Sequence, residues 1–416
     1  MVAPAGRHTR RWPAAIEHDG HNYLTTAQVA KVLGIKAESV YAYVSRGRLN
    51  SVRIAGIRGS LFAVDDVECL LGEGIRRRPP AGVVERIRTH ITSLAGDDLI
   101  YRGHRVQELV GTDFLDVARL LWDHDVPQQL SPLTAHTGRA LSAILPAEAT
   151  RLDAVRIAVD LAGAADLMRY QLSAPAVAVK AMQILQAAAA ALPPATNSGS
   201  VQHKNADSFA KQLWPKLSPL APTPRRVAAL NAALVLLADH DLAASTVAAR
   251  VAASARAGIY SVVSAGLSAL DGPLHGGAAT AAYRYLQGAL DDPQRTVAES
   301  LRAGERIPGA GHRVYRDHDP RAVALMQLLR AAGGGDRIRA AVDIIAATVA
   351  DTKARLINSD MALAAMALQF RMPADAPEVI FGIARIAGWV AHALEEYDEP
   401  MLRFRPEGVY VGKRSG

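Results

Sequence analysis

Segments rich in Ala, Leu and Val fill the chain from about residue 90 onward, and AALNAALVLLA (228–238) is typical of them. Ala has the highest helix propensity of the common residues, whereas sheets favour aromatic and β-branched residues. Only 5% of the 416 residues are aromatic, although 50% are hydrophobic. Pro, Gly and Asn interrupt the pattern at 192–200, 218–224 and 330–336, where we expect loops. The sequence therefore predicts an all-α, mainly helical protein with a large core.

Several classes of protein are excluded by what the sequence lacks. The apolar segments are shorter than the roughly 20 residues that a membrane-spanning helix needs. The first twenty residues have no apolar centre like that of a secretory signal, so we expect a cytoplasmic protein. The only cysteine, Cys69, excludes an intrachain disulfide framework and a multi-cysteine metal site. No HExxH or comparable spacing occurs, and we expect no bound metal.

The positive charge of the chain is concentrated near its N-terminus. Residues 1–90 contain 14 Lys and Arg against 8 Asp and Glu, which leaves 33 against 32 for the remainder of a chain with net charge +7. Such an asymmetry indicates a module that binds a polyanion, joined to a nearly neutral body.

Residues 22–71 have the pattern of a small separate domain. Thr25 or Thr26 can cap a short helix that Gly34 ends, and a second helix follows from about Ala37. The segment VRIAGIRGSLFAV then alternates apolar with other residues around two glycines, as a hairpin does. This order of helix, turn, helix and basic hairpin resembles the winged helix-turn-helix of the MerR and excisionase type.

That resemblance implies that the second helix enters the major groove of duplex DNA while basic residues of the hairpin contact phosphates. The alternative is a degenerate module that serves only for packing or dimer contacts. Residues 72–90, with three successive arginines and a pair of prolines, have the composition of a basic linker. The residues expected to contact DNA are Tyr41, Arg46, Arg53 and Arg58.

Four segments of the helical body carry ionisable residues for which an Ala-rich helical protein has little structural use. His240 ends an apolar helix, where it can be simply a cap that interacts with the helix dipole. His275 lies among glycines just before an expected helix, a position that favours a neutral imidazole. His312 follows a Gly-rich turn and Arg321 lies nine positions later, whereas Asp360 precedes an apolar helix and can be its N-cap.

A fifth feature is the segment VIFGIARIAGWVAHALEE (379–396). Arg385 and His392 are its only polar side chains before the terminal glutamates, and their spacing of seven places them on one helix face. A guanidinium among apolar neighbours is expected to be partly buried, and a buried guanidinium needs a compensating anion. That anion is either a protein carboxylate or a carboxylate of a ligand.

Taken in order, GPLHGG, PGAGHRVYRDHDPRA, NSD, IARIAGWVAH and RFRPEGVYVG resemble the motifs of the citrate synthase family. The resemblance begins near LAGDDLIYRGHRVQEL (94–109), extends to residue 412, and covers about three-quarters of the chain. It implies an almost entirely helical fold with two domains. The large domain would consist of residues 91–271 and 376–416, and the small domain, residues 272–375, would close over the substrates.

The resemblance also implies a reaction of the tricarboxylic acid cycle, in which acetyl-CoA, oxaloacetate and water give citrate and CoA. Asp360 would remove a methyl proton of acetyl-CoA while neutral His275 stabilises the enolate oxygen. His312 would polarise the ketone of oxaloacetate for attack. Neither a metal nor a redox cofactor is implied, and acetyl-CoA is a substrate.

Binding residues are implied in the same way. Arg405 matches an arginine that reaches into the partner subunit's site, which implies a homodimer. Asp317, His318 and Asp319 have no implied role, and we expect them to be solvated. The residues implied to bind oxaloacetate are His240, Arg321 and Arg385, and those implied to bind the CoA adenine through their backbone are Ile307, Pro308, Gly309, Ala310 and Gly311.

The sequence departs from the family pattern at a few positions. Leu237 and Ala243 replace two polar residues near the oxaloacetate site, and Met361 replaces an aromatic residue after the base. The 2-methylcitrate synthases share the scaffold and use propionyl-CoA, a difference of one methylene worth roughly 1–3 kcal/mol in an apolar pocket. A 2-methylcitrate synthase is therefore an alternative, as is a DNA-binding regulator whose synthase body senses a ligand.

Overall fold

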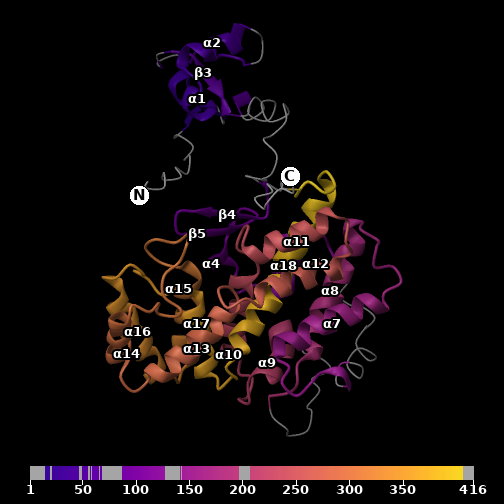
Figure 1. The fold of residues 1–416 in the computed structure, drawn as a ribbon, viewed down its shortest axis with the longest axis vertical. Helices are drawn as coiled ribbons and strands as arrows, with labels where there is room; N and C mark the ends of the chain where they lie inside the picture. Colours follow the sequence, from indigo (N-terminus) through magenta and orange to yellow (C-terminus); the bar gives the residue numbers. More distant parts are fainter. Residues whose placement is uncertain are drawn as a thin grey trace, which may run out of the picture. The chain divides into compact units, whose positions relative to one another are not determined.

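The computed structural model describes residues 15–18, 21–45, 49–54, 57, 59–64, 66–67, 87–126, 141, 143–195 and 207–405. These residues form two compact units, shown in Figure 1. One is drawn from residues 1–85, with Arg405 grouped with it, and the other covers 86–404. Each unit has its own hydrophobic core and is described separately.

The N-terminal unit contains two helices and a small antiparallel sheet of strand order β1-β2-β3. Its elements are β1 (Ile16–His18), β2 (His21–Thr25), α1 (Thr26–Leu33), α2 (Ala37–Ser45) and β3 (Leu61–Ala63).

Helix α1 begins and ends as expected, and α2 begins at Ala37 as expected. Thr25 caps α1 in a reciprocal capping box with Gln28, and Gly34 ends the helix with a left-handed φ of 68°. The predicted hairpin is confirmed only at its base, where Val52 and Leu61 exchange backbone hydrogen bonds of 2.8 and 2.9 Å. Strand β3 also pairs with β2, on the far side of which β1 is added. Because β1 starts at Ile16, the sheet begins before residue 22, the first residue of the predicted domain.

The second unit is mainly helical, as predicted, with one short antiparallel sheet ahead of the helices. The sheet contains β4 (Thr92–Ala95), β5 (Asp98–Tyr101) and β6 (His104–Arg105). The first helices are α4 (Val106–Leu109), α5 (Phe114–Trp122), α7 (Arg151–Ala165), α8 (Ala174–Ala191), α9 (Phe209–Leu217), α10 (Pro224–Leu237), α11 (Ala244–Ser254) and α12 (Ile259–Leu270). The later ones are α13 (Gly277–Ala289), α14 (Pro293–Ala303), α15 (Pro320–Ala332), α16 (Asp336–Ala350), α17 (Ser359–Gln369) and α18 (Ala376–Asp398).

Helix α18 runs through the middle of this unit and is buried along most of its length (Figure 1). Small residues let its neighbours approach closely. A Cβ on Gly266 of α12 would lie 2.5 Å from the indole of Trp389, so only glycine fits there. Because helices surround α18, the side chains of Arg385 and His392 point into the protein, with 1% and 0% exposure respectively.

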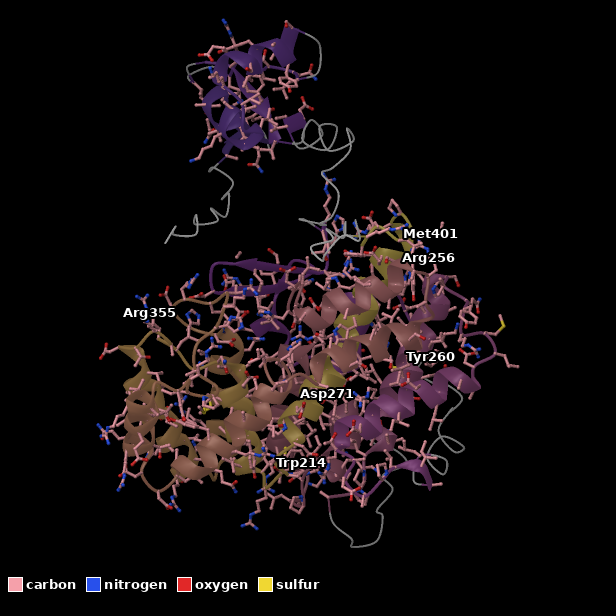
Figure 2. All side chains as sticks on the ribbon, in the orientation of Figure 1. Trp214, Arg256, Tyr260, Asp271, Arg355 and Met401 are labelled. Atoms are coloured by element: carbon pink, nitrogen blue, oxygen red, sulfur yellow. The ribbon has the colours of Figure 1, made fainter. Side chains whose placement is uncertain are left out.

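The C-terminal end of α18 is fastened to the turn after α11. Arg256 donates to the carbonyl oxygens of Glu396 at 2.9 Å and Glu399 at 2.6 Å. The N–H of Leu402 donates to the carbonyl of Ser254 at 2.9 Å, and Figure 2 shows Arg256 close to Met401. These contacts hold the backbone from Glu396 to Leu402 against the turn after α11.

Among the helices of the described residues, α8 has the length and mean hydropathy, 1.2, of a membrane span. Over half of it, 56%, is buried inside the fold. It packs against α7 and α18, as the core helix of a globular unit does.

Candidate active site

His312 lies in the loop between α14 and α15, directly after Gly311, whose φ is 81°. Its Nδ1 accepts the backbone N–H groups of Val314 at 3.0 Å and Tyr315 at 3.2 Å. The neutral ring therefore carries its proton on Nε2. Nε2 also lies 3.3 Å from Nη2 of Arg321, and since both nitrogens then carry protons, this approach is a contact between two donors and not a hydrogen bond. Burial, assisted by the charge of Arg321, lowers the pKa of His312 to about 4, so that it is a neutral hydrogen-bond donor at pH 7.

Arg321 is buried and already has a carboxylate partner. Asp319 caps α15 and accepts from Arg321 Nε at 2.9 Å and from Nη2 at 2.8 Å. It also accepts the N–H of Ser359, the first residue of α17, at 2.9 Å. The prediction that Asp319 is solvated is therefore wrong, because the buried guanidinium of Arg321 needs this anion.

Asp317 and His318, the other two residues expected to be solvated, are exposed. Their backbone is nevertheless held by Asp97, in the turn between β4 and β5. Its carboxylate accepts the N–H groups of Arg316, Asp317 and His318 at 3.0, 2.9 and 3.2 Å. These hydrogen bonds hold the pKa of Asp97 below its usual range and fix the loop that carries His312.

Arg385 has no such partner. Its guanidinium lies over the ring of Phe381, 4.9 Å from the centroid, and is 1% exposed. Nε and Nη1 are buried without a hydrogen-bond partner among the described residues. Burial lowers the pKa of Arg385, while the more distant Asp239 opposes that shift. Of the two anions considered for Arg385, this geometry favours a ligand carboxylate.

His240 follows α10 and joins His312 through Tyr315. Its Nε2 lies 3.0 Å from the hydroxyl of Tyr315, whose ring stacks on His312 at a centroid distance of 4.6 Å. The two imidazole centroids are 5.2 Å apart. Burial, followed by the charges of Arg321 and Arg385, lowers the pKa of His240 well below its usual range. Tyr315 was not among the predicted residues, because nothing in the sequence indicates that its hydroxyl meets His240.

His275 is held in the turn between α12 and α13 by a hydrogen bond from its N–H to the carbonyl of Gly272, 2.9 Å. Its Nε2 lies 2.8 Å from the hydroxyl of Ser245, which the sequence analysis also missed. The ring meets Phe381 edge-on, 5.6 Å between centroids. Burial, with the charge of Arg385 second, lowers the pKa of His275 to about 4, so the imidazole is neutral at pH 7.

Asp360 is not the cap of its helix. Asn358 caps α17 by accepting the N–H of Asp360 at 2.9 Å, which leaves the Asp360 carboxylate available for chemistry. That carboxylate is half-buried, and burial raises its pKa to about 6. A carboxylate with such a pKa is still ionised at pH 7 and is a stronger base than an exposed one.

The Ile307–Gly311 loop is bound to the start of α17. The N–H of Asn358 donates to the carbonyl of Gly309 at 2.9 Å, and its Nδ2 donates to the carbonyl of Gly311 at 2.9 Å. Gly309, with φ 77°, lies so close to α17 that a Cβ would come within 2.9 Å of the Cβ of Met361. Any ligand held by this loop is therefore placed relative to Asp360.

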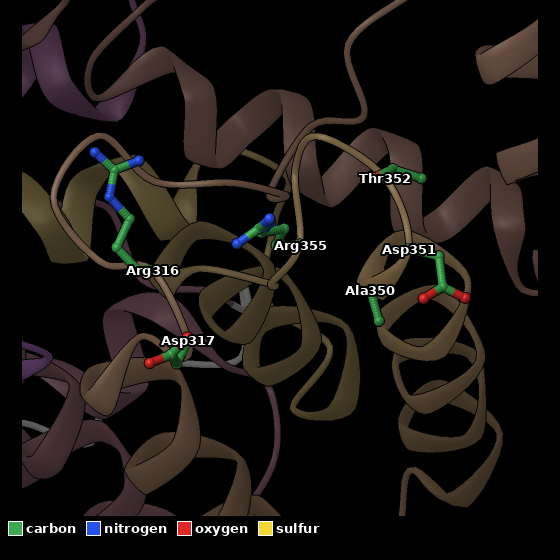
Figure 3. Close-up of a pocket in the computed structure, with 6 residues that line it drawn as sticks. All are labelled: Arg316, Asp317, Ala350, Asp351, Thr352 and Arg355. Atoms are coloured by element: carbon green, nitrogen blue, oxygen red, sulfur yellow. The ribbon is translucent and has the colours of Figure 1, made fainter.

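A polar cavity of about 450 Å³ lies between the loop after Tyr315 and the segment that follows α16. Figure 3 shows Arg316 and Arg355 on one side and Asp351, directly after α16, on the other. The adjacent Ala354 contacts Gly311, since a Cβ on Gly311 would lie 3.5 Å from its Cα. The cavity thus borders the Ile307–Gly311 loop and is lined by two arginines together with Asp317 and Asp351.

The remaining predicted residues lie outside this cluster. Arg405 is exposed and is grouped with the N-terminal unit. In that unit Tyr41 of α2 is 54% exposed and Arg53 is exposed, as a contact surface requires. Arg46, Arg58 and most of the predicted linker lie outside the described residues.

Two family models match the chain. The one described as citrate synthase, C-terminal domain, matches residues 82–407, and the one described as a helix-turn-helix domain matches residues 23–71. Together they account for the body and for the N-terminal unit.

Curated relatives agree with the longer match. The chain is 30% identical over 345 residues to citrate synthase 2 of Bacillus subtilis, which is 77% of this chain and 92% of that protein. It is 38% identical over 188 residues to the citrate synthase of Haloferax volcanii, covering 44% of this chain and 49% of the other.

Solved structures share the fold. The citrate synthase of Pyrobaculum aerophilum aligns with a TM-score of 0.62 at 26% identity, over 80% of this chain and 91% of that one. The ternary complex of Thermoplasma acidophilum citrate synthase with carboxymethyl coenzyme A and oxaloacetate aligns with a TM-score of 0.65 at 24% identity, over 80% and 96% of the two chains.

Proposed function

Because the chain belongs to the citrate synthase family and is an enzyme of that type, we propose that it condenses acetyl-CoA with oxaloacetate and water to give citrate and CoA. The observation that carries the proposal is the buried guanidinium of Arg385, whose Nε and Nη1 have no partner among the described residues. It contacts the same Phe381 ring as the neutral imidazole of His275. A site for a small dicarboxylate next to a hydrogen-bond donor suits this reaction.

The first step forms the enolate of acetyl-CoA. Asp360 accepts a proton from the methyl carbon as its C–H bond breaks, and the electron pair moves onto the thioester oxygen. The reaction requires the proton of His275 on Nδ1 to stabilise this oxygen, and the Ser245 hydroxyl, 2.8 Å from Nε2, then donates to that nitrogen. Since burial lowers the pKa of His275 to about 4, the ring donates as a neutral group.

The second step joins the enolate to the ketone carbon of oxaloacetate. His312 donates its Nε2 proton to the ketone oxygen as negative charge develops there. Arg385 binds one carboxylate of oxaloacetate, and the free donors of Arg321, together with His240, bind the other. Water then attacks the thioester carbon of citryl-CoA, the C–S bond breaks, and CoA leaves as the thiol.

Citrate synthase and 2-methylcitrate synthase remain the two candidates, and they differ in the acyl-CoA that they prefer. A 2-methylcitrate synthase would accept propionyl-CoA, and Met361, the buried residue directly after Asp360, is our candidate for the side chain that limits the room for the extra methylene. The test follows release of free CoA thiol from purified protein with oxaloacetate and either acyl-CoA. A higher kcat/KM for propionyl-CoA would favour 2-methylcitrate synthase, and no thiol from either donor would overturn the enzyme proposal.

The cavity of Arg316 and Arg355 is a candidate site for the phosphates of CoA, because it adjoins the Ile307–Gly311 loop. Replacing both arginines with Gln is expected to raise the KM for acetyl-CoA about tenfold with little change in the KM for oxaloacetate. Steady-state kinetics would measure both. Arg302→Gln, on the exposed surface of α14, is the matched control, and an equal effect there would refute the assignment.

We also propose a cytoplasmic homodimer in which Arg405 completes the partner subunit's site. Arg405→Ala and Asp360→Ala homodimers should each be inactive. After unfolding and refolding together, the mixture should recover about a quarter of the wild-type rate, because about half of randomly formed dimers are hybrids with one intact site. Recovery would be measured by thiol release, and a mixture as inactive as its components would contradict the shared site.

The N-terminal unit is proposed to bind duplex DNA through α2 and the segment around Arg53. Replacing Arg53 with Gln is expected to weaken binding to duplexes of any sequence and to reduce the slope of log K against log salt by about 1. Fluorescence anisotropy across a salt series measures this slope. The control is Arg337→Gln, exposed in the second unit, and an unchanged slope in Arg53→Gln would refute the contact.

A further inference from the structure

A second group of buried charges lies behind the site, between α10, α11 and α18. Asp239, Arg250, His392 and Glu396 are each 0% exposed, and none of them has a role in the reaction proposed above. Arg250 donates to Glu396 at 3.1 Å and to Glu395 at 2.9 Å. Arg403 donates to Glu396 at 2.6 and 2.7 Å. We call this group the buried charge cluster.

The hydrogen bonds of His392 have a defined direction. Arg250 Nη1 lies 2.6 Å from His392 Nδ1, and a guanidinium can only donate. Nδ1 is therefore an acceptor without a proton, and the ring carries its proton on Nε2. That nitrogen faces Asp239 Oδ2 at 3.4 Å, so a chain of donors runs from Arg250 through His392 to Asp239.

Asp239 directly precedes His240, and its surroundings fix that peptide. The hydroxyl of Tyr101 donates to the Asp239 carbonyl at 2.8 Å, and the N–H of Asp241 donates to the Asp239 carboxylate at 3.0 Å. On the other side, a Cβ on Gly388 would lie 2.3 Å from Asp239 Oδ1. The Asp239 carboxylate is thus enclosed between α18 and the turn that carries His240.

The charges of the cluster balance only when the active site is included. Glu395 and Glu396 are matched by Arg250 and Arg403, while His392 is neutral. This leaves the negative charge of Asp239, whose electrostatic counterpart is Arg385 of the active site. Burial would raise the pKa of Asp239, but the hydrogen bond from neutral His392 and the charge of Arg385 oppose it, and the pKa lies below its usual range.

We propose that Arg250 and His392 are positioning residues for oxaloacetate: they orient the Asp239 carboxylate, which balances the charge of Arg385 and holds the peptide that aims His240. This inference rests on the proposed function, because it assigns the cluster to the oxaloacetate half of the same site. It predicts that damage to the cluster weakens oxaloacetate binding more than acyl-CoA binding.

The test compares His392→Phe with His392→Gln in the full-length protein. Phe preserves the ring volume but cannot donate to Asp239, whereas Gln can place an N–H near the position of Nε2 and an oxygen near Arg250. His392→Phe is expected to raise the KM and the calorimetric Kd for oxaloacetate at least about tenfold, with the KM for acetyl-CoA changed less than about twofold. His392→Gln should recover most of the loss.

Each outcome of this test supports or overturns the inference. Selective loss in His392→Phe with recovery in His392→Gln supports it. Unchanged oxaloacetate binding in His392→Phe overturns it, as does an equal rise of both KM values that Gln does not reverse, which a purely structural cluster would produce. If His392→Phe does not fold, Arg250→Lys replaces it, because a single ammonium nitrogen does not reproduce the guanidinium fork that meets His392, Glu395 and Glu396 together. The same selective loss in Arg250→Lys then supports the inference. An unchanged KM for oxaloacetate overturns it. An inactive wild-type protein that binds no oxaloacetate would instead refute the proposed function.

Discussion

Replacing Asp360 with Ala is expected to lower kcat by at least about a thousandfold while leaving the affinity for oxaloacetate nearly unchanged. The carboxylate is half-buried, it does not cap α17, and burial raises its pKa to about 6. No other residue assigned here can take the methyl proton, since His275 and His312 are already neutral donors. The measurement pairs thiol release with calorimetric titration of oxaloacetate.

The matched control is Asp317→Ala, an exposed carboxylate in the loop that carries His312. Its side chain has no role in the mechanism, so its kcat should stay within about twofold of the wild-type value. An Asp360→Ala enzyme with the wild-type rate would show that another group is the base. Loss of oxaloacetate binding as well would point to a structural role for Asp360.

The same carboxylate governs the pH dependence. Because burial raises the pKa of Asp360 to about 6, kcat/KM should rise with pH through about 6 and then level off. His275 and His312, with pKa values lowered to about 4, contribute no inflection between pH 5 and 8. A profile that falls as pH rises through 6 would require a protonated group in the role assigned to Asp360.

Features that depend on a few neighbouring residues could be predicted from the sequence. The cap at Thr25 and the stop at Gly34 follow from local backbone chemistry, and the helical body follows from its Ala-rich apolar segments. The burial of Arg385 could be predicted because the residues around it on the same helix are apolar. In each case the determining contacts lie within a turn or two of the residue concerned.

Pairings between separate elements could not be predicted in this way. Ser245 meets His275 from the start of α11, and Tyr315 meets His240 from a different loop, contacts that depend on how the helices pack. Asp319 is a different case, because its signal was local. An Asp followed by Pro and then Arg321 is the pattern of a helix N-terminus, so the sequence itself contains the signal for this cap and ion pair, which the expectation of a solvated Asp319 overlooks.

Replacing Arg385 with Leu is expected to weaken oxaloacetate binding by at least about a hundredfold with only a small loss of stability. Two nitrogens of the buried guanidinium have no hydrogen-bond partner among the described residues, so the guanidinium itself stabilises the fold little, but its removal leaves Asp239 without its counter-charge. The free energy of unfolding should therefore fall by less than the about 3–5 kcal/mol expected when a hydrogen-bonded buried arginine is removed. Denaturant titration and calorimetry measure the two quantities.

Arg250→Leu is the matched control, because Arg250 is equally buried but pairs with Glu395, Glu396 and His392. Removing it leaves Glu395 without its cation and Glu396 with Arg403 alone, which should cost about 3–5 kcal/mol of stability. The comparison of the two variants distinguishes the two anions considered for Arg385. A ligand carboxylate predicts lost binding with a smaller loss of stability, whereas a hydrogen-bonded protein carboxylate predicts that Arg385→Leu is destabilised as much as Arg250→Leu. The second result would remove Arg385 from the oxaloacetate site and assign it to the core.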